Sequence, residues 1–205
     1  MNDIIMHKGW LMVKKQEMTK IWIGDQFVPV TLVKVVPQEI VRYKTKEKDG
    51  YVAAVVGTEK KEVDAKKGKK IEYAMSAEFD VDEQFIGQHA IGSVLDQSLV
   101  EGVEKVSIMG YAIGKGFQGM VKKWHVKGMG ATHGHKFTRT GWSKGNRKPR
   151  RTMKGHPHAG HMGTQRVTIK EVKILDKMIS EKEQILVLKG SLPGAYNGML
   201  KLAIQ

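Results

Sequence analysis

Runs of apolar and β-branched residues predict strands in the first part of the chain. Residues 27–36 read FVPVTLVKVV and end before Pro37, which favours a strand that tolerates one proline at an edge. Residues 51–56 read YVAAVV after an Asp-Gly turn signal, and residues 103–109 form a third run of this kind. The mixed-charge run at residues 60–70 interrupts the pattern. We expect a solvated helix or loop there, with an RNA contact as the alternative.

The strand pattern returns near the C-terminus with a break in its alternation. Val167 and Ile169 share one parity, whereas Val172 and Ile174 share the other. Because successive side chains of a strand point to opposite faces, this phase slip predicts a bulge within one long strand. Two further apolar runs predict strands at residues 184–189 and 199–204.

The positions of these strands predict the fold class. Because strands lie at both ends of the chain, the body is expected to be a mainly antiparallel β-barrel closed by non-local pairing. The full expectation is a mainly β protein with a small α+β insertion near residues 40–100 and a long basic extended loop. Residues 1–113 and 166–205 together form the predicted body, and residues 114–165 form the predicted extension.

Composition and charge exclude several classes of protein. The chain has 205 residues, no cysteine, and 35 Lys and Arg against 21 Asp and Glu. Without cysteine it has no disulfide framework, thiolate zinc site or cysteine nucleophile. No run of 18 apolar residues occurs, and the first eight residues do not resemble a signal peptide. We therefore expect a cytoplasmic protein without a membrane partner.

The excess positive charge is concentrated in one segment. Residues 105–170 contain ten Lys, five Arg and no Asp or Glu, so they carry +15 and the rest of the chain sums to −1. They also contain twelve of the 23 glycines and few aliphatic residues. Such a segment repels itself and lacks the apolar residues of an ordinary core. It therefore requires a polyanionic partner, and nucleic acid is the first candidate.

A glycine-rich motif in this segment resembles a nucleotide-binding loop but lacks its other parts. Residues 114–119 read GKGFQG, which matches G-x-G-x-x-G. A dinucleotide site also needs an acidic residue about 20 positions later to bind the ribose, and the next carboxylate is Glu171. Residues 110–115 likewise miss the spacing of a phosphate-binding loop. No nucleotide cofactor or small-molecule substrate is expected.

Five histidines in the basic segment have the spacing of metal ligands. His133 and His135 are two residues apart, and His156, His158 and His161 form H-x-H-x-x-H. Neighbouring lysines and arginines would repel a dication, and no nearby carboxylate can orient a histidine for catalysis. We therefore predict neither a metal site nor an enzyme. Histidines of this kind can stack on a base or donate to a phosphate.

Aromatic residues alternate with cations along the segment. Phe117, Trp124, Phe137 and Trp142 lie among lysines and arginines. Cations position phosphates and aromatic faces stack on unpaired bases, so the pattern predicts RNA binding. For Phe117 and Trp124, anchoring the extension onto the body is an equally open alternative. The predicted RNA-binding residues are Lys115, Phe117, Lys122, Lys123, Trp124, His125, Lys127, His133, His135, Lys136, Arg139, Trp142, Lys144, Arg147, Lys148, Arg150, Arg151, Lys154, His156, His158, His161 and Arg166.

Several blocks of the sequence resemble one known family. KGFQG at 115–119, VKKW at 121–124 and ATHG at 131–134 are similar to the signature of large-subunit ribosomal protein three in its bacterial form. Further similar blocks occur at 14–19, 28–31, 154–163, 166–168 and 187–194. Glu17 departs from the family pattern, which has glycine there. Arg147 stands where some bacterial members carry a methylated glutamine, so that modification should be absent.

This resemblance implies a structural protein of the ribosome. It implies a split β-barrel body of the translation-protein type and an extension that runs through ribosomal RNA towards the peptidyl transferase centre. It also implies a role in early subunit assembly. The expected partners are large-subunit ribosomal RNA and neighbouring ribosomal proteins, in a ribosome of bacterial or organellar type. A free-standing RNA-binding chaperone is the alternative, because the same electrostatics would serve it.

The length of the extension is compatible with such a path. Residues 114–165 number 52, and a two-limbed finger would have 26 residues per limb. At about 3.3 Å per residue, each limb could span at most roughly 85 Å.

Overall fold

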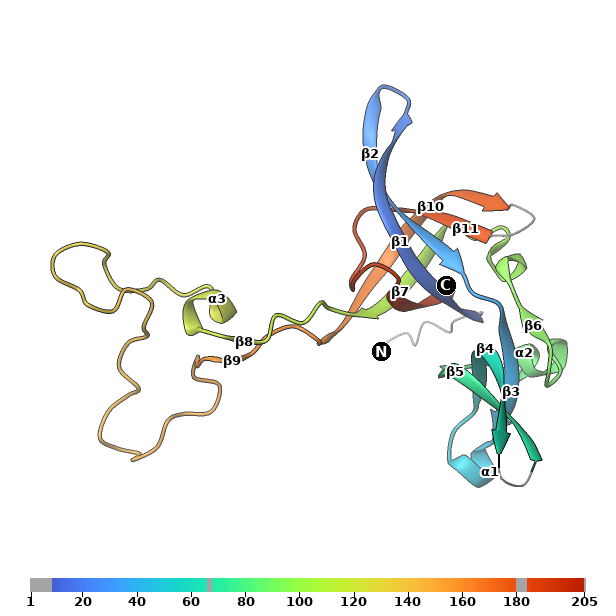
Figure 1. The fold of residues 1–205 in the computed structure, drawn as a ribbon, viewed down its shortest axis with the longest axis horizontal. Helices are drawn as coiled ribbons and strands as arrows, with labels where there is room; N and C mark the ends of the chain where they lie inside the picture. The colour runs from blue at the N-terminus through green and yellow to red at the C-terminus, as the bar shows by residue number, and fades with distance from the viewer. Residues whose placement is uncertain (1–8, 66–67, 180–183, 205) are drawn as a thin grey trace, which may run out of the picture. The chain divides into compact units, whose positions relative to one another are not determined.

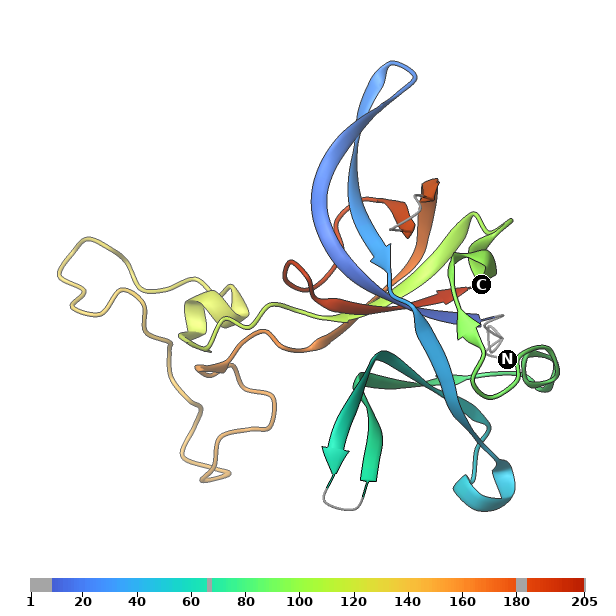
Figure 2. The same cartoon turned by 45° about the vertical axis from the view of Figure 1, so that its right-hand side comes forward.

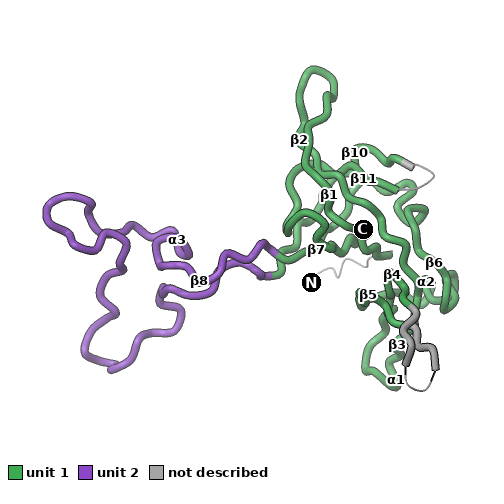
Figure 3. The backbone as a smooth tube through the Cα atoms, in the orientation of Figure 1, with its two compact units in different colours: residues 1–111, 166–205 green, residues 112–165 purple. Residues whose placement is uncertain are grey.

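A computed structural model describes residues 9–65, 68–179 and 184–204 of the chain. Residues 1–8, on which the signal-peptide expectation rests, lie outside the described residues. The chain divides into two compact units, one formed by residues 1–111 and 166–205 and the other by residues 112–165 (Figure 3). The mainly β class predicted from the sequence is confirmed, because most described elements are strands.

Six strands of the first unit form a closed antiparallel barrel (Figures 1 and 2). Their order is β1 (Gly9–Ile23), β12 (Met199–Ile204), β7 (Lys105–Tyr111), β10 (Arg166–Ile179), β11 (Gln184–Lys189) and β2 (Gln26–Val35), and β2 returns to β1. Strands from both ends of the sequence are thus neighbours, and the first strand pairs with the last.

The barrel interior is filled by aliphatic side chains that the register places side by side. Leu202 lies opposite Leu11 on one neighbouring strand and opposite Ile108 on the other. All three are fully buried, as are Leu186 and Leu188 of β11. Burial of these side chains supplies the main stabilising term for the body, at about 25 cal/mol per Å² of apolar surface.

The predicted bulge in the long C-terminal strand is confirmed. The register between β10 and β7 shifts between Ile169 and Val172. The apolar residues of one parity therefore lie before the bulge, and those of the other parity lie after it. Glu171 lies within the shift and has a positive φ of 55°. An extra residue in one strand of a pair produces such a local break in the ladder.

A second sheet and three short helices make up the insertion near residues 40–100. Its order is β5 (Gly68–Asp80), β4 (Ala53–Ala65), β3 (Gln38–Lys44) and β6 (Val94–Leu95). The helices are α1 (Lys46–Asp49), α2 (Glu83–Gln88) and the 3₁₀ helix η1 (Gln97–Val100). Its buried residues Ile40, Val56 and Phe79 belong to the same core cluster as the barrel residues.

The expectation of a helix or loop at residues 60–70 is wrong wherever the structure describes this run. Residues 60–65 lie in β4 and residues 68–70 lie in β5, whereas residues 66 and 67 are outside the described residues. The strands pair as a hairpin, with Lys61 opposite Glu72. Opposite charges across a strand pair are favourable, so a charged run can extend a sheet instead of ending it.

Candidate RNA-binding surface

The two limbs of the second unit, residues 112–165, begin as a paired stem. The backbone N–H of Lys115 donates to the carbonyl of Met162, and the N–H of Met162 donates to Gly116, each at 2.9 Å. Two short strands, β8 (Phe117–Gln118) and β9 (Gly160–His161), continue the pairing, with Phe117 opposite His161. The stem therefore closes the remaining residues of the unit into a single long loop.

Gly163 allows the two limbs to approach closely. Its φ is +85°, and a Cβ atom there would lie 2.3 Å from the Ile113 carbonyl oxygen and 2.8 Å from Gly114 Cα. Any side chain would meet backbone atoms, which cannot move without opening the stem. Glycine at this position is thus a requirement of the stem.

Replacing Gly163 with alanine should open the stem. We expect faster amide exchange at Met162 and Lys115, because the new methyl group cannot share space with the opposite backbone. Gly155→Ala is the matched control, since Gly155 also has a positive φ (+80°) but a Cβ added there would meet no atom within 4 Å. Equal exchange in the two variants would show that the conformational cost alone, without the close approach, determines the effect.

The stem leads into α3 (Met120–Trp124), which carries three of the predicted RNA-binding residues. Lys122 and Trp124 are exposed, while Lys123 is half-buried, with its Nζ 5.6 Å from the centre of the Trp124 ring. The indole Nε1 of Trp124 donates to the carbonyl of His158 at 2.8 Å. Trp124 is therefore anchored to the opposite limb through its edge while part of its ring stays exposed.

A small cluster inside the unit was not predicted from the sequence. Met120 is buried, and a Cβ at Gly141 would lie 2.4 Å from its sulfur, so a side chain added there would displace the end of the Met120 side chain. The Nζ of Lys144 lies 4.0 Å from the same sulfur. An apolar residue just before the VKKW block was the available signal, but a single methionine within a basic segment does not predict burial.

An aromatic row adjoins this cluster. The rings of Trp142 and His156 are 6.4 Å apart, and those of His156 and His158 are 5.2 Å apart. Desolvation, followed by the positive charges of Lys144 and then His156, lowers the pKa of His158 below its usual 6.5. Trp142, one of the predicted RNA-binding residues, thus has the His156 ring beside it and is 44% exposed.

Nearly all of the predicted RNA-binding residues are exposed. Lys123 and His156 are half-buried, and the other twenty are exposed. The unit contains twelve Lys and Arg and no carboxylate. No carboxylate inside the unit can therefore pair with these cations. The surface therefore offers uncompensated positive charge interleaved with exposed aromatic rings, which suits a flexible polyanion with unstacked bases.

The histidines do not assemble into a metal centre in the described part of the chain. No group of three or more His, Cys, Asp or Glu lies close enough there to hold an ion. His161 instead lies beside Thr164, with Nε2 3.3 Å from the hydroxyl oxygen.

Among the described helices, none is long and apolar enough to cross a membrane.

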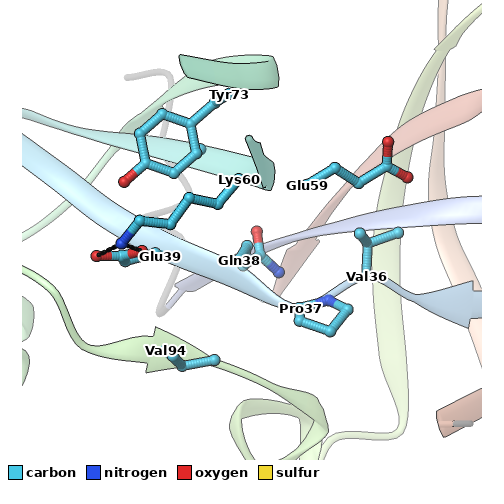
Figure 4. A pocket seen from close by; sticks show the side chains of 9 residues that line it. Val36, Pro37, Gln38, Glu39, Glu59, Lys60, Tyr73 and Val94 are labelled. Atoms are coloured by element: carbon cyan, nitrogen blue, oxygen red, sulfur yellow. Dashed lines mark hydrogen bonds and ion pairs between the residues drawn. The ribbon is translucent and has the colours of Figure 1, made fainter. Parts of the chain in front are cut away.

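A pocket of about 260 Å³ lies over the second sheet, lined in part by Val36, Pro37, Tyr73 and Val94 (Figure 4). Its charged groups are paired within the body. Lys60 Nζ lies 3.1 Å from Glu39, and Glu59 pairs with Lys14, which lowers the pKa of the Glu59 carboxyl. The pocket therefore has apolar walls and internally satisfied charges, which does not favour acid–base chemistry.

The comparisons with known proteins all find ribosomal proteins of one family. A family model described as Ribosomal protein L3 matches residues 3–184. The Large ribosomal subunit protein uL3 of Geotalea daltonii is 33% identical over 206 residues, covering 95% of each chain. The protein of that name from Thermotoga petrophila is 34% identical and covers 91% of this chain and 92% of its own. The one from Deinococcus radiodurans is 36% identical and covers 90% and 89%.

Proposed function

The chain belongs to the ribosomal protein L3 family, a structural component of the ribosome and not an enzyme, and from this premise we propose that it binds large-subunit ribosomal RNA through residues 112–165. The observation that carries the proposal is the composition and exposure of this unit. Twelve cations without a carboxylate lie around exposed aromatic rings, so phosphates and unstacked bases can both be bound.

The proposal assigns different roles to the two units. The barrel and its insertion form a nearly neutral body of the family's barrel type, which contacts neighbouring ribosomal proteins and RNA at lower charge density. Residues 114–165 neutralise phosphates inside folded RNA, assist early assembly of the subunit and reach towards the peptidyl transferase centre. Arg166, at the start of β10 in the first unit, would also contact a phosphate.

Salt-washed large subunits test this function against the alternative of a free-standing RNA chaperone. A structural ribosomal protein stays with the large subunit during sedimentation after the wash, because its contacts form an ordered interface. A chaperone bound through general charge attraction dissociates, since counterion competition weakens such contacts steeply. Recovery of most of the chain in the unbound fraction would favour the chaperone.

The salt dependence of RNA binding should report the number of phosphate contacts. If about eight cations contact phosphates, the slope of log affinity against log salt should be roughly −6, at about 0.7 per contact. Replacing Lys122 and Lys123 with alanine should flatten it by one to two units in a filter-binding titration. Lys46→Ala with Lys48→Ala is the matched control, because both lysines are exposed on α1 of the body. An unchanged slope in the α3 variant would mean that these lysines do not face RNA.

A further inference from the structure

The hairpin formed by β1 and β2 extends well beyond its pairing with the rest of the barrel. Its outer part runs from Lys20 opposite Pro29 to Ile23 opposite Gln26, and it turns at Gly24 and Asp25. Pairing of β2 with β11 ends at Val30, so the outer part is a two-stranded ribbon. Figures 1 and 2 both show this ribbon projecting beyond the other strands of the first unit.

One face of the ribbon carries exposed aromatic side chains. Trp22 and Phe27 are directly opposite each other and are 60% and 59% exposed. Their rings meet edge to face with centres 4.5 Å apart, and Lys20 Nζ lies 4.5 Å from the centre of the Phe27 ring. Met18, two residues before Lys20 on the same face, is 49% exposed. A concentrated apolar patch of this kind on a protruding element indicates a binding surface.

The size and chemistry of this face favour a nucleobase over a protein. A stable protein interface buries about 800 Å² per partner, and a face only two strands wide offers a handful of side chains. A base needs one flat ring to stack on and a cation nearby for its phosphate. Glu17 and Asp25 offset the charge of Lys20, so the attraction here would come mainly from stacking.

We propose that Trp22, Phe27 and Lys20 form a second RNA site, on the body, which stacks an unpaired base of ribosomal RNA. The inference rests on the proposed function, because it takes ribosomal RNA as the partner. It adds a contact that depends on aromatic stacking and lies outside the basic extension.

Ultraviolet crosslinking of purified large subunits tests the site directly. Trypsin releases Trp22 and Phe27 together in peptide 21–34, and it releases Trp142 of the second unit in peptide 140–144. Mass spectrometry should find a nucleotide adduct on peptide 21–34. An adduct on 140–144 without one on 21–34 overturns this site and leaves the proposed function standing. A crosslink from Trp22 to a neighbouring protein also overturns it, and adducts on neither peptide contradict both proposals.

Binding by full-length variants separates stacking from charge. Trp22→Ala with Phe27→Ala should weaken binding to large-subunit ribosomal RNA about tenfold, the loss expected when a base loses its stacking partner. The slope of affinity against salt should stay unchanged, in contrast to the α3 lysine variant. Ile23→Ala is the matched control, because Ile23 is 44% exposed on the opposite face of the same ribbon and its loss should leave affinity unchanged. Equal affinity in all three proteins would overturn the site.

Discussion

Deleting residues 143–151 is expected to leave the body folded and the chain able to join the subunit, while altering the RNA around the catalytic centre. The deletion removes five of the unit's twelve cations and no residue of the barrel. If all five contact phosphates, the salt slope for RNA binding should flatten by about 3.5. The family relationship motivates the expected location, since we propose that this part approaches the peptidyl transferase centre. Chemical probing of ribosomes that carry the deletion measures the effect.

A full-length variant separates the loss of charge from the loss of chain in this experiment. Glutamine at Lys144, Arg147, Lys148, Arg150 and Arg151 keeps the length of the loop and removes its charge. If the loop acts by neutralising phosphates, the glutamine variant should reproduce the reactivity changes of the deletion. Reactivity changes confined to the exterior of the subunit would contradict the inward placement of these residues.

The strands that the sequence predicted best are those bounded by turn residues. The runs at 184–189 and 199–204 match β11 and β12 at both ends, because Gly190, Pro193 and Gly194 separate two short apolar stretches. In the barrel these strands meet partners from the start and middle of the chain. The bulge in β10 was also predictable, since a parity change in an apolar pattern has few other structural explanations.

The long strand β1 could not be predicted in the same way, because a polar stretch interrupts it. Its register shifts between Lys15 and Met18, so no single alternation runs through the strand. Lys15 is accommodated by tertiary contacts, since its Nζ donates to the carbonyls of Leu192 (2.7 Å) and Gly194 (2.9 Å). These acceptors are more than 170 residues away in the sequence, where a local pattern gives no sign of them.

The RNA-binding surface was predicted from charge, which can be read from the sequence. The packing of side chains within residues 112–165 could not be predicted in this way. The absence of carboxylates predicted a segment that needs a polyanionic partner, and most basic residues of 112–165 are exposed. The contact of Met120 with Gly141 depends on the chain returning on itself, which composition does not encode. The exposed ring of Trp22 was missed for a different reason. Trp22 lies in β1, for which the sequence predicted no strand, so its place on a ribbon face opposite Phe27 could not be expected.

Replacing Leu202 with alanine should destabilise the body by about 2–5 kcal/mol, the range for a large aliphatic residue removed from a packed core. Leu202 is fully buried on β12, directly between Leu11 and Ile108 on the two neighbouring strands. Its loss leaves a cavity where three strands meet, and their backbones are held by ladder hydrogen bonds that limit collapse. Denaturant unfolding of the full chain measures the change in the free energy of unfolding.

Ile91→Ala provides the control for this loss, because it also shortens an aliphatic side chain in the body but at a position that is 64% exposed. Its effect should stay within about 0.5 kcal/mol, as for most surface substitutions. The salt slope of RNA binding should remain that of the parent in Leu202→Ala at temperatures where the body is folded, because the cations of residues 112–165 are unchanged. Equal destabilisation by the two substitutions would contradict the barrel core, and a flattened slope would show that the RNA contacts of residues 112–165 depend on the packing of the body.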